Sequence, residues 1–562
     1  MREPPDPGSS SDRVVILIES APRDLDPRYA SDASSTKVAR LIHCSLFTVE
    51  TNDLRPQPEV ASSLEPACPD GPADCRHWVV HLKPGVFWHD GVEVTPADVV
   101  YTFRSLIEGQ RPSPFRGELR RKMKRIWVEG EAVHFLLSTP YASFPVDLAI
   151  GLVPEHVLAP RGGLDGAFHD DFIGCGPYRF IGRYRDQKVM LEKSSIYWKK
   201  GGPQHLVVRT VPDEATRVLS MMAGSGQLVV NALSPPVVQK LQDMPEVEVS
   251  HRPAACTTYL SFNLLDQRLA DLRVRQAIAA GIDRESLVDE QFIGMAQVAT
   301  GIIPPLHWAY EEDVEDHPYN PDKARKLLDE AGLYPNPATG IRSRFTLKVT
   351  PDFFRKNIGA LIAHRLGELG IEVDLVPLEL STFLADVRSG NYELYILQLP
   401  QVIDPDILRW LLYSQAAPRL NPQPGSSRFG QVDRTLLPPH FSAVEGPIAN
   451  ECRYRWYPRV LLQALTNFQQ IQAGRNPAIG SGNRSFFMDP TMDCLLDLGN
   501  MAMTEAKRLP YYREAQRIMA SQLPVLALWH EDNIAVTRRG VSGYQLLPLN
   551  RYSPILDVGI NL

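Results

Sequence analysis

The chain has 562 residues, a formal net charge of -7 and a hydrophobic fraction of 44%. This length exceeds what one hydrophobic core usually serves, so two or more lobes are expected. The 59 basic residues are spread among 66 acidic ones without a basic stripe, which argues against a nucleic-acid partner. No run of about eighteen apolar residues occurs, so no membrane-spanning helix is expected.

The N-terminal residues MREPPDPGSSSDR lack the basic start and apolar stretch of a signal peptide. Residues 1–13 are therefore predicted to be a flexible polar leader. The apolar run at 14–18 predicts an early buried strand, and TKVARLIHCSLF at 36–47 has the pattern of a helix.

Residues 77–106 combine several local signals in a fixed order. Period-2 alternation predicts a strand over 77–82, and Asp90-Gly91 is a hairpin turn signal because glycine reaches positive φ without steric cost. Thr95, with Pro96 at the first helical position and Asp98 at the third, forms a capping-box pattern at the start of a helix. This stretch is expected to fold compactly.

Beyond residue 261 the pattern changes to alternating strands and helices. Asn320 is predicted to cap a helix that ends at Gly332, followed by a strand at 345–349 and a helix at 361–369. The remaining elements are a strand at 371–375, a helix capped by Ser381 and ended near Gly390, and an apolar strand at 394–399. This alternation favours a parallel sheet covered by helices.

Seven segments resemble, in order, those of family 5 extracellular solute-binding proteins, the receptors of bacterial ABC importers for peptides and related solutes. They are LKPGVFWHDGVEVTPADVVYTF at 82–103, GCGPYRF at 174–180, YLSFN at 259–263, DLRVRQAIAAGIDRESLV at 271–288, GIIPP at 301–305, YNPDKARKLLDEAGL at 319–333 and YREAQRIMASQLPVLAL at 512–528. One match alone would be weak evidence, but seven in order cover nearly the whole chain.

The resemblance implies an α/β, two-lobed periplasmic-binding-protein-like fold of class II, in the large cluster with an extra subdomain. Lobe I would comprise residues 14–261 and 526–562, with the subdomain at about 55–190. Lobe II would comprise residues 262–525. Crossover strands would join the lobes, and ligand would bind between them and hold them closed.

An irregular stretch at 420–482 has no counterpart of similar length in the family pattern, so we expect an insertion there. An insertion beside a cleft could act as a lid, but long surface insertions cost little loop entropy and usually have no ligand role.

The seven cysteines match no zinc motif. Cys68 and Cys75 flank a turn-rich loop short enough for a surface disulfide, which would suit an exported protein. The other cysteines sit singly among mostly apolar or small neighbours, which favours buried thiols for most of them: Cys44, Cys175, Cys256, Cys452 and Cys494.

Catalytic motifs are absent from the sequence: it contains no GxxxxGK, HExxH, GxSxG or strand-linked GxGxxG. His89-Asp90 and His530-Glu531 put acid beside imidazole, but neighbours in a strand point to opposite faces, so neither pair is a ready dyad. The lone histidines form no obvious metal-ligand set. We therefore expect neither an enzyme nor a cofactor.

Candidate ligand residues follow from the resemblance. The loop after Leu25-Asp26-Pro27 would bring residues 31–34, with Asp32 and Ser34 foremost, near the ligand. Peptide-binding members have an aspartate three residues before an acidic-Pro pair, which binds the peptide's α-ammonium. Here the pair is Asp404-Pro405, and Gln401 replaces the aspartate.

The tryptophan expected three residues before the anchor is also replaced, by Gln398. Two amides suit hydroxyls, amides or a neutral solute better than a free amino terminus, although Asp404 could supply the missing charge. Tyr259, Trp410 and Trp529 could stack on a ligand, with the protein core as the alternative for each. The predicted ligand-binding set is Asp32, Ser34, Tyr259, Gln398, Gln401, Asp404 and Trp410.

The sequence thus predicts a monomeric solute-binding receptor that captures a peptide or other small polar solute and delivers it to an ABC importer permease. The periplasm or cell exterior is the expected location, with or without a lipid anchor, and the export signal would be absent from this sequence. Transport of a saccharide or chelated nickel, a ligand-sensing partner of a signalling receptor, and an enzyme using the 420–482 insertion are the alternatives.

Overall fold

The computed structural model describes residues 6–8, 11–68, 76–414, 452 and 482–561. The chain divides into two compact units, residues 1–254 with 532–562 (unit 1) and residues 255–531 (unit 2). The sequence-based boundaries were 261 and 526. They differ because the strand at 257–262 pairs with the strand at 394–399, and so belongs to unit 2.

Unit 1 contains a mixed sheet whose strand order is β8-β9-β10-β1-β11-β18, with β12 also paired to β18. Strand β1 is parallel to β10 and β11, and the other pairs are antiparallel. The strands are β8 (Tyr178–Tyr184), β9 (Lys188–Lys193), β10 (His205–Thr210), β1 (Arg13–Ile18), β11 (Leu228–Val230), β18 (Val525–Arg538) and β12 (Val247–Pro253). Residues 178–193 therefore belong to this sheet and not to the subdomain expected to reach about residue 190.

A second, antiparallel sheet in unit 1 has the order β4-β5-β7-β6. Its strands are β4 (Ala61–Pro66), β5 (His77–Leu82), β7 (Ala132–Leu137) and β6 (Met123–Glu129), and α2 (Pro96–Glu108) and α3 (Arg116–Lys122) accompany them. The predicted strand at 77–82 and the capping box of Thr95 and Asp98 are both present. Trp88, Phe103 and Phe135 are fully buried in the core beneath this sheet.

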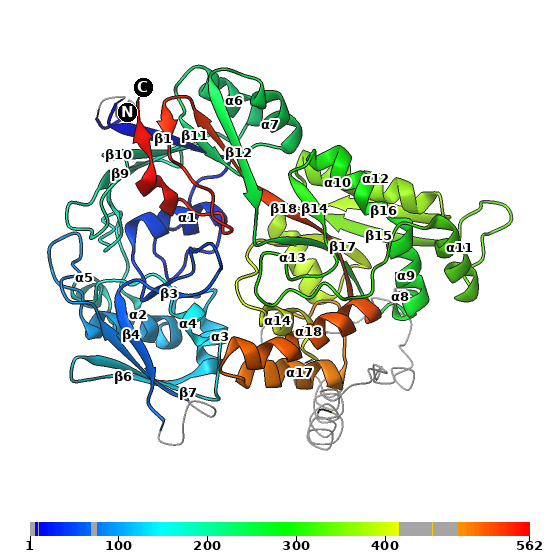
Figure 1. Ribbon diagram of the computed structural model, residues 1–562, viewed down its shortest axis with the longest axis horizontal. Coiled ribbons are helices and arrows are strands. Elements are labelled where there is room, and N and C mark those ends of the chain that lie inside the picture. The colour runs from blue at the N-terminus through cyan, green and yellow to red at the C-terminus, as the bar shows by residue number, and fades with distance from the viewer. Residues whose placement is uncertain (1–5, 9–10, 69–75, 415–451, 453–481, 562) are drawn as a thin grey trace. The chain divides into compact units, whose positions relative to one another are not determined.

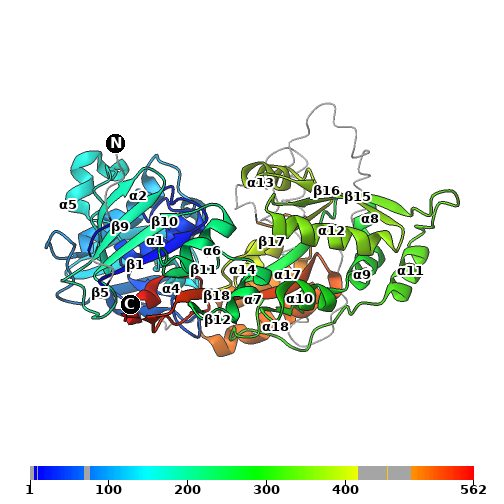
Figure 2. The same cartoon turned by 90° about the horizontal axis from the view of Figure 1, so that it is seen from above.

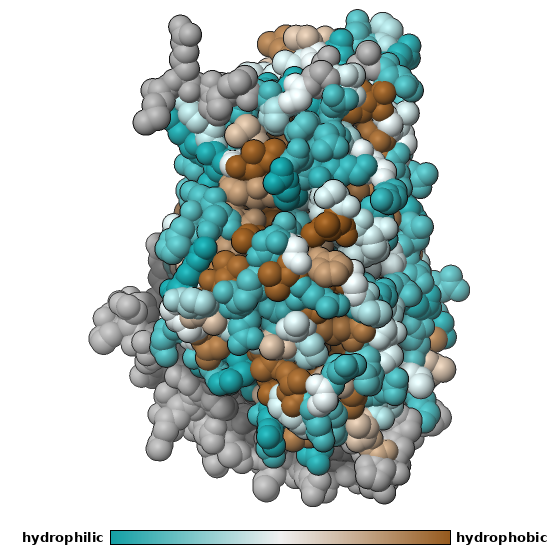
Figure 3. All heavy atoms as spheres, turned by 90° about the vertical axis from the view of Figure 1, so that its left-hand side faces the viewer, coloured by the Kyte–Doolittle hydropathy of each residue, from teal (hydrophilic) through white to brown (hydrophobic). Residues whose placement is uncertain are grey.

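The remaining elements of unit 1 are short, apart from three helices. They are α1 (Ala33–Ile42), β2 (Phe47–Thr48), β3 (Gln57–Pro58), α4 (Phe144–Asp147), α5 (Glu155–Leu158), α6 (Glu214–Met222), α7 (Pro235–Gln242), β19 (Val541–Ser542) and β20 (Gly559–Ile560). Short 3₁₀ turns lie at Ala159–Arg161, Gly163–Asp165 and Ser553–Asp557. On the face of unit 1 drawn in Figure 3, apolar side chains gather in several patches separated by polar ones.

The N-terminal leader is attached to unit 1 at Asp6. Its carboxylate lies 2.7 Å from the Lys188 ammonium and 2.8 Å from the Arg209 guanidinium. Sequence reasoning predicted a flexible leader because the segment is polar and lacks an apolar stretch. Ion pairs to distant strands leave no local signal, so that expectation missed the attachment.

Unit 2 contains a sheet with the order β16-β15-β17-β13-β18, and β14 pairs with β18. Strand β15 is parallel to β16 and β17, whereas β13 is antiparallel to β17 and β18. The strands are β16 (Ile371–Pro377), β15 (Ser343–Val349), β17 (Leu394–Leu399), β13 (Thr257–Phe262) and β14 (Ala296–Val298). The predicted alternation of strands and helices is therefore present, with a parallel part at one edge.

The helices of unit 2 agree with the predicted alternation, and α12 lies beside β15 and β16 in both ribbon views (Figures 1 and 2). They are α8 (Gln267–Ala270), α9 (Leu272–Gly281), α10 (Arg284–Phe292), α11 (Pro321–Glu330), α12 (Phe353–Gly367), α13 (Leu380–Ser389), α14 (Ile407–Leu412), α17 (Pro490–Met501) and α18 (Glu505–Gln522). Asn320 caps α11 as predicted. Helix α13 begins at Leu380, and Glu379 occupies the N-cap position. Ser381 therefore lies inside the helix and is not its cap.

The cysteines differ from the sequence-based expectation. Cys44 is bonded to Cys175 and Cys452 to Cys494, so four of the five expected thiols form disulfides. Partners 131 and 42 residues apart meet only after folding, and sequence spacing does not reveal such pairs. Cys256 is a buried thiol, as expected. Cys68 is disulfide-bonded, as predicted. That its partner is Cys75 stays a prediction, because Cys75 lies outside the described residues, as does nearly all of the expected 420–482 insertion.

Candidate functional site

In open α/β sheets, ligands bind beyond the carboxyl ends of the strands. In unit 1 the carboxyl end of β1 leads into the loop 19–32 and then into α1. Asp32 caps this helix, since its carboxylate accepts hydrogen bonds from the Ser35 amide at 2.8 Å and from the Ser35 hydroxyl at 2.6 Å. Ser34 is buried, and its hydroxyl lies 3.2 Å from that of Ser20, which follows β1. Both predicted residues lie at this edge, but Asp32 has a clear role in the helix cap.

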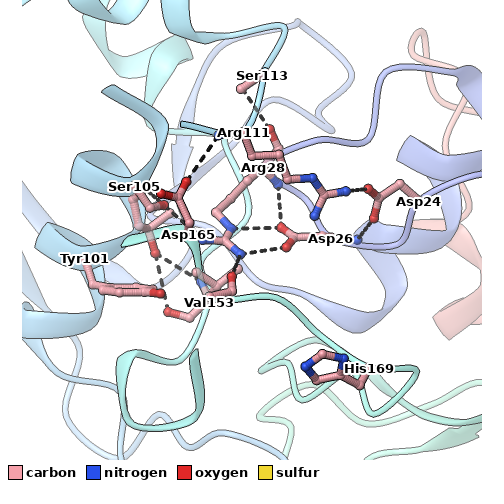
Figure 4. Close-up of polar contacts among 12 residues, drawn as sticks. Asp24, Asp26, Arg28, Tyr101, Ser105, Arg111, Ser113, Val153, Asp165 and His169 are labelled. Carbon is pink, nitrogen blue, oxygen red and sulfur yellow. Dashed lines mark hydrogen bonds and ion pairs between the residues drawn. The ribbon is translucent and has the colours of Figure 1, made fainter. Parts of the chain in front are cut away.

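A buried ion pair holds this loop in place (Figure 4). The Arg28 guanidinium, which is fully buried, donates two hydrogen bonds to the Asp26 carboxylate, at 3.0 Å and 2.7 Å. It also donates to the Ser105 hydroxyl of α2 at 3.1 Å and to the Gly166 carbonyl at 2.8 Å. The Leu25-Asp26-Pro27 segment is thereby fastened to α2 and to the 163–166 turn.

A second ion pair lies next to the first (Figure 4). The Arg111 guanidinium donates to the Asp24 carboxylate and stacks 3.8 Å from the centroid of the Tyr29 ring. Burial raises the pKa of Asp24, partly offset by the hydrogen bond from the Asp26 amide and by Arg111. The loop that leads to α1 is therefore held on both sides.

In unit 2 the carboxyl end of β17 leads into the loop 400–406, which carries Gln401. Three contacts hold this loop: the Val402 amide donates to the Ala255 carbonyl at 2.7 Å, His307 bonds to the Ile403 carbonyl at 3.0 Å, and Asp404 pairs with Arg508. Gln401 itself is half-buried. A fixed backbone therefore presents an amide where peptide-binding relatives are expected to present a carboxylate.

Asp404 is committed to an ion pair within unit 2. Its two carboxylate oxygens accept hydrogen bonds from the Arg508 guanidinium at 2.6 Å and 2.8 Å, and one of them also accepts the Asp406 amide at 2.9 Å. The two side chains are nearly buried. This geometry favours the role of Asp404 in shaping the backbone over the alternative that it supplies the missing charge.

The predicted aromatic residues occupy different environments. Tyr259 is fully buried, with its hydroxyl 3.4 Å from that of Tyr395, and Trp529 is buried in the neighbouring core. Both rings are buried in the hydrophobic cores, so the structure gives no support to the expectation that Tyr259 faces a ligand. Trp410, on α14, is half-buried, and the Arg484 guanidinium lies 5.2 Å from its ring centroid. Gln398 is half-buried on β17 and donates to the Cys256 thiol at 3.9 Å.

Neither acid–imidazole neighbour pair forms a dyad. The Gly174 amide donates to Nδ1 of His89, so Nε2 donates to the Gly176 carbonyl at 2.9 Å. His530 is buried, and its Nδ1 lies 3.0 Å from the Thr257 hydroxyl. No group of three or more potential metal ligands occurs within the part of the chain that the structure describes.

Sequence reasoning missed Arg355, in the first turn of α12 just beyond the carboxyl end of β15. Its guanidinium lies 4.0 Å from the carboxylates of Asp352 and Glu531, the outer limit for an ion pair, and makes no hydrogen bond to a described residue. An arginine soon after a strand end was visible in the sequence as TPDFFR. Its unused donors became apparent only once its neighbours were placed.

A family model described as "Bacterial extracellular solute-binding proteins, family 5 Middle" matches residues 55–418. The chain belongs to this family. It is a solute-binding receptor of an ABC importer, as the sequence predicted. The two-lobed family 5 fold predicted for it is also confirmed. Among the described residues, no helix is long and apolar enough to cross a bilayer.

Several curated relatives are similar along nearly their whole length. "Di/tripeptide-binding protein 2" of Pseudomonas aeruginosa is 25% identical, with 96% of this chain and 93% of the relative covered. "Heme-binding protein A" of Haemophilus influenzae is 22% identical, with 98% and 93% covered.

Solved structures agree in fold. NikZ from Campylobacter jejuni in complex with Ni(L-His) has a TM-score of 0.75 at 19% identity, with 98% of this chain and 99% of that one covered. DppA from Helicobacter pylori in complex with the peptide STSA has a TM-score of 0.75 at 21% identity, with 98% of each covered. The ligands differ among these solute-binding proteins, so the fold leaves the solute of this chain open.

Proposed function

We propose that this receptor captures a peptide-like solute that carries a carboxylate and does not require a free α-ammonium. The observation that carries the proposal is the charge pattern at the carboxyl edge of the unit 2 sheet. Gln401 is uncharged, the carboxylate of Asp404 in the same loop is bound by Arg508, and the Arg355 guanidinium makes no hydrogen bond to a described residue. An ammonium beside Gln401 would meet an amide in place of the expected carboxylate, whereas a carboxylate would find the Arg355 guanidinium.

Arg355 would bind the carboxylate through two parallel hydrogen bonds, the geometry for which a guanidinium is suited. Gln401 and Gln398 would donate to and accept from amide or hydroxyl groups of the solute. The curated relative "Di/tripeptide-binding protein 2" supports a peptide-like ligand. The predicted contacts of Asp32, Ser34 and Trp410 remain part of this proposal.

The protein would act by binding alone, as a monomer, outside the cytoplasmic membrane, and would pass the solute to a membrane permease. The disulfides Cys44–Cys175 and Cys452–Cys494 support that location, because such bonds persist in oxidising compartments.

The test is a thermal-shift panel of one dipeptide in three forms: unmodified, N-acetylated and C-terminally amidated. The N-acetylated form, with its free carboxylate, should stabilise the protein, and at a hundred times its dissociation constant a ligand adds about 2.7 kcal/mol. The amidated form should not. A preference for the amidated peptide with a free amino terminus would contradict the proposal, and a response only to oligosaccharides or nickel chelates would replace it.

The matching substitution is Arg355→Gln, which should remove the stabilisation by the acetylated dipeptide. Arg365→Gln on the same helix is the control, because Arg365 is part of an exposed ion pair with Glu368. Equal binding by both variants would exclude Arg355 as the carboxylate partner.

A further inference from the structure

Lys37 is the most unusual charged residue of unit 1. It lies on α1 with only 8% of its surface exposed, between buried residues of the helix such as Val38. Its ammonium makes no hydrogen bond or ion pair with any residue that the structure describes, and the ring of Tyr552 lies 5.4 Å away. Removing most of a lysine from water without a protein acceptor for its ammonium costs free energy, so its retention here calls for an explanation.

The charges around Lys37 do not neutralise it. Glu19 directly follows β1 and is exposed, and it acts on Lys37 through space without reaching ion-pair distance. Arg551, the other charged neighbour, is itself positive and lies 3.5 Å from the carboxylate of Glu50. Burial lowers the pKa of Lys37 to about 7, so the ammonium is poorly stabilised when no anion is bound.

The position of Lys37 relates it to the ligand edge of unit 1. Helix α1 begins beside Ser20 at the carboxyl end of β1, and Lys37 lies less than two turns into the helix, near Glu19 of the same strand end. Ligands of open α/β sheets bind at such edges. An anion that reached the ammonium would supply its missing partner.

We propose that Lys37 is an anion-binding residue at the carboxyl end of β1 that takes a second carboxylate of the transported solute, in addition to the one assigned to Arg355. The inference rests on the proposed function for the identity of the anion. The alternative is a lysine whose stem packs against the core while its ammonium meets only water. The anion-binding role and the packing role predict different effects on anion affinity when the charge of Lys37 is removed.

The experiment is calorimetric titration of succinate at pH 6.5, at constant ionic strength set with chloride, into the Arg355→Gln protein and the same protein carrying Lys37→Met. Working in Arg355→Gln isolates the unit 1 site from the carboxylate partner proposed for unit 2. The dissociation constant of succinate should rise at least ten-fold in Lys37→Met. Lys326→Met, at an exposed lysine of α11, should leave it unchanged.

The melting temperature of the ligand-free protein is the second measurement. Replacing an unpaired buried ammonium by methionine should leave it equal or higher, because the desolvation cost disappears. A lower melting temperature together with unchanged succinate binding would overturn the proposal in favour of a packing role. Lys37→Gln provides a second neutral variant, and unchanged succinate affinity in a folded Lys37→Gln protein would overturn it equally.

The pH dependence provides a third criterion. The groups that act on Lys37 are Glu19 from the end of β1 and Arg551 and the Tyr552 ring from the C-terminal segment. Succinate affinity should fall as the pH rises from 6 to 9, because the ammonium loses its proton. A pH-independent affinity would contradict binding by Lys37.

Failure of this inference can be told apart from failure of the proposed function. If an N-acetylated dipeptide with an acidic side chain, which carries a second carboxylate besides the one assigned to Arg355, binds the wild-type protein and Lys37→Met with equal affinity, only the role of Lys37 is excluded. If no peptide-like solute binds but succinate binds in a Lys37-dependent manner, the anion site stands and the solute class is wrong. Absence of saturable succinate binding to the Arg355→Gln protein would overturn the inference.

Discussion

Single side chains set the charge at the carboxyl ends of β1 in unit 1 and of β15 and β17 in unit 2. After β17, Gln401 stands where an aspartate is expected in peptide-binding relatives. The carboxylate of Asp404, in the same loop, is paired with Arg508. Lys37 and Arg355 add positive charge at the ends of β1 and β15. This pattern is the reverse of what a free α-ammonium needs, and it is the basis for the solute class proposed above.

Gln401→Asp should restore an amine anchor. A charge-assisted hydrogen bond contributes about 1.5–3 kcal/mol, so the affinity for a dipeptide with a free amino terminus should rise about ten-fold or more, measured by calorimetric titration. Gln401→Ala should weaken binding of the acetylated dipeptide and leave the melting temperature of the empty protein nearly unchanged.

Gln267→Asp, at an exposed position of α8, is the control for added negative charge. An equal gain in both aspartate variants would assign the effect to long-range charge. A large loss of stability in the empty Gln401→Ala protein would make Gln401 a structural residue.

His530 should make unit 2 sensitive to acid. Burial lowers its pKa to about 4, whereas the unfolded chain binds the proton near pH 6.5. Because only the unfolded state takes up this proton between those values, the free energy of unfolding should fall as the pH drops from 6.5 to 4, by about 3 kcal/mol for this residue.

His530→Asn keeps a donor near the Thr257 hydroxyl and removes the titration, so its urea unfolding should depend less steeply on pH over this range. His364→Asn, at an exposed histidine of α12, should retain the wild-type slope. Equal slopes in all three proteins would exclude His530 as the acid-sensitive group.

Secondary-structure elements position the loop 400–406 through contacts from distant parts of unit 2. The Ala309 amide donates to Nδ1 of His307, so Nε2 must carry the proton that is donated to the Ile403 carbonyl. Helix α18 supplies Arg508 from the other side. The neutral histidine and the ion pair together fix the backbone that carries Gln401.

Arg508→Met should destabilise unit 2 by about 3–5 kcal/mol, because it leaves the carboxylate of Asp404 nearly buried without this partner. Chemical unfolding measures the loss. Arg513→Met on the same helix should change the free energy of unfolding by less than about 1 kcal/mol, since its ion pair with Glu311 is half-exposed on the arginine side. Similar losses in both variants would contradict a special role for the pair with Asp404.

Many of these elements could be predicted from the sequence because they depend on patterns of neighbouring residues. The capping box at Thr95, the asparagine cap at Asn320 and the strand at 394–399 depend on neighbours a few residues away, and the structure contains each of them. The prediction that Ser381 caps a helix was wrong. A serine near a helix start has the sequence pattern of a cap, but β16 ends at Pro377 and the helix already begins at Leu380.

At the scale of the whole molecule, each unit has its own hydrophobic cores and at least one disulfide of its own. Cys44–Cys175 lies in unit 1 and Cys452–Cys494 in unit 2, and β18 carries the chain from unit 2 to unit 1. Separate cores favour unfolding as two cooperative units.

Calorimetry should therefore resolve two transitions, and removal of each disulfide should lower a different one. Chain entropy predicts losses of about 5 kcal/mol for Cys44→Ala with Cys175→Ala, and about 4 kcal/mol for Cys452→Ala with Cys494→Ala. The two double variants act as controls for each other. A single transition that shifts equally in both would show that the units unfold together.

Segments of contiguous sequence sufficed to identify the family, the alternating elements of unit 2 and the absence of the aspartate anchor at Gln401, because each depends on residue types at short spacing. The disulfide partners, the pairing of Asp404 with Arg508, the burial of Tyr259 and the lone ammonium of Lys37 required the tertiary structure. Those features depend on contacts between side chains that are tens to hundreds of residues apart in the sequence. Burial makes such contacts important, because a buried polar or charged group without a partner costs several kcal/mol of free energy. The elements of this receptor are therefore encoded locally, whereas the pairing of the charges on which the proposed solute class rests depends on the fold.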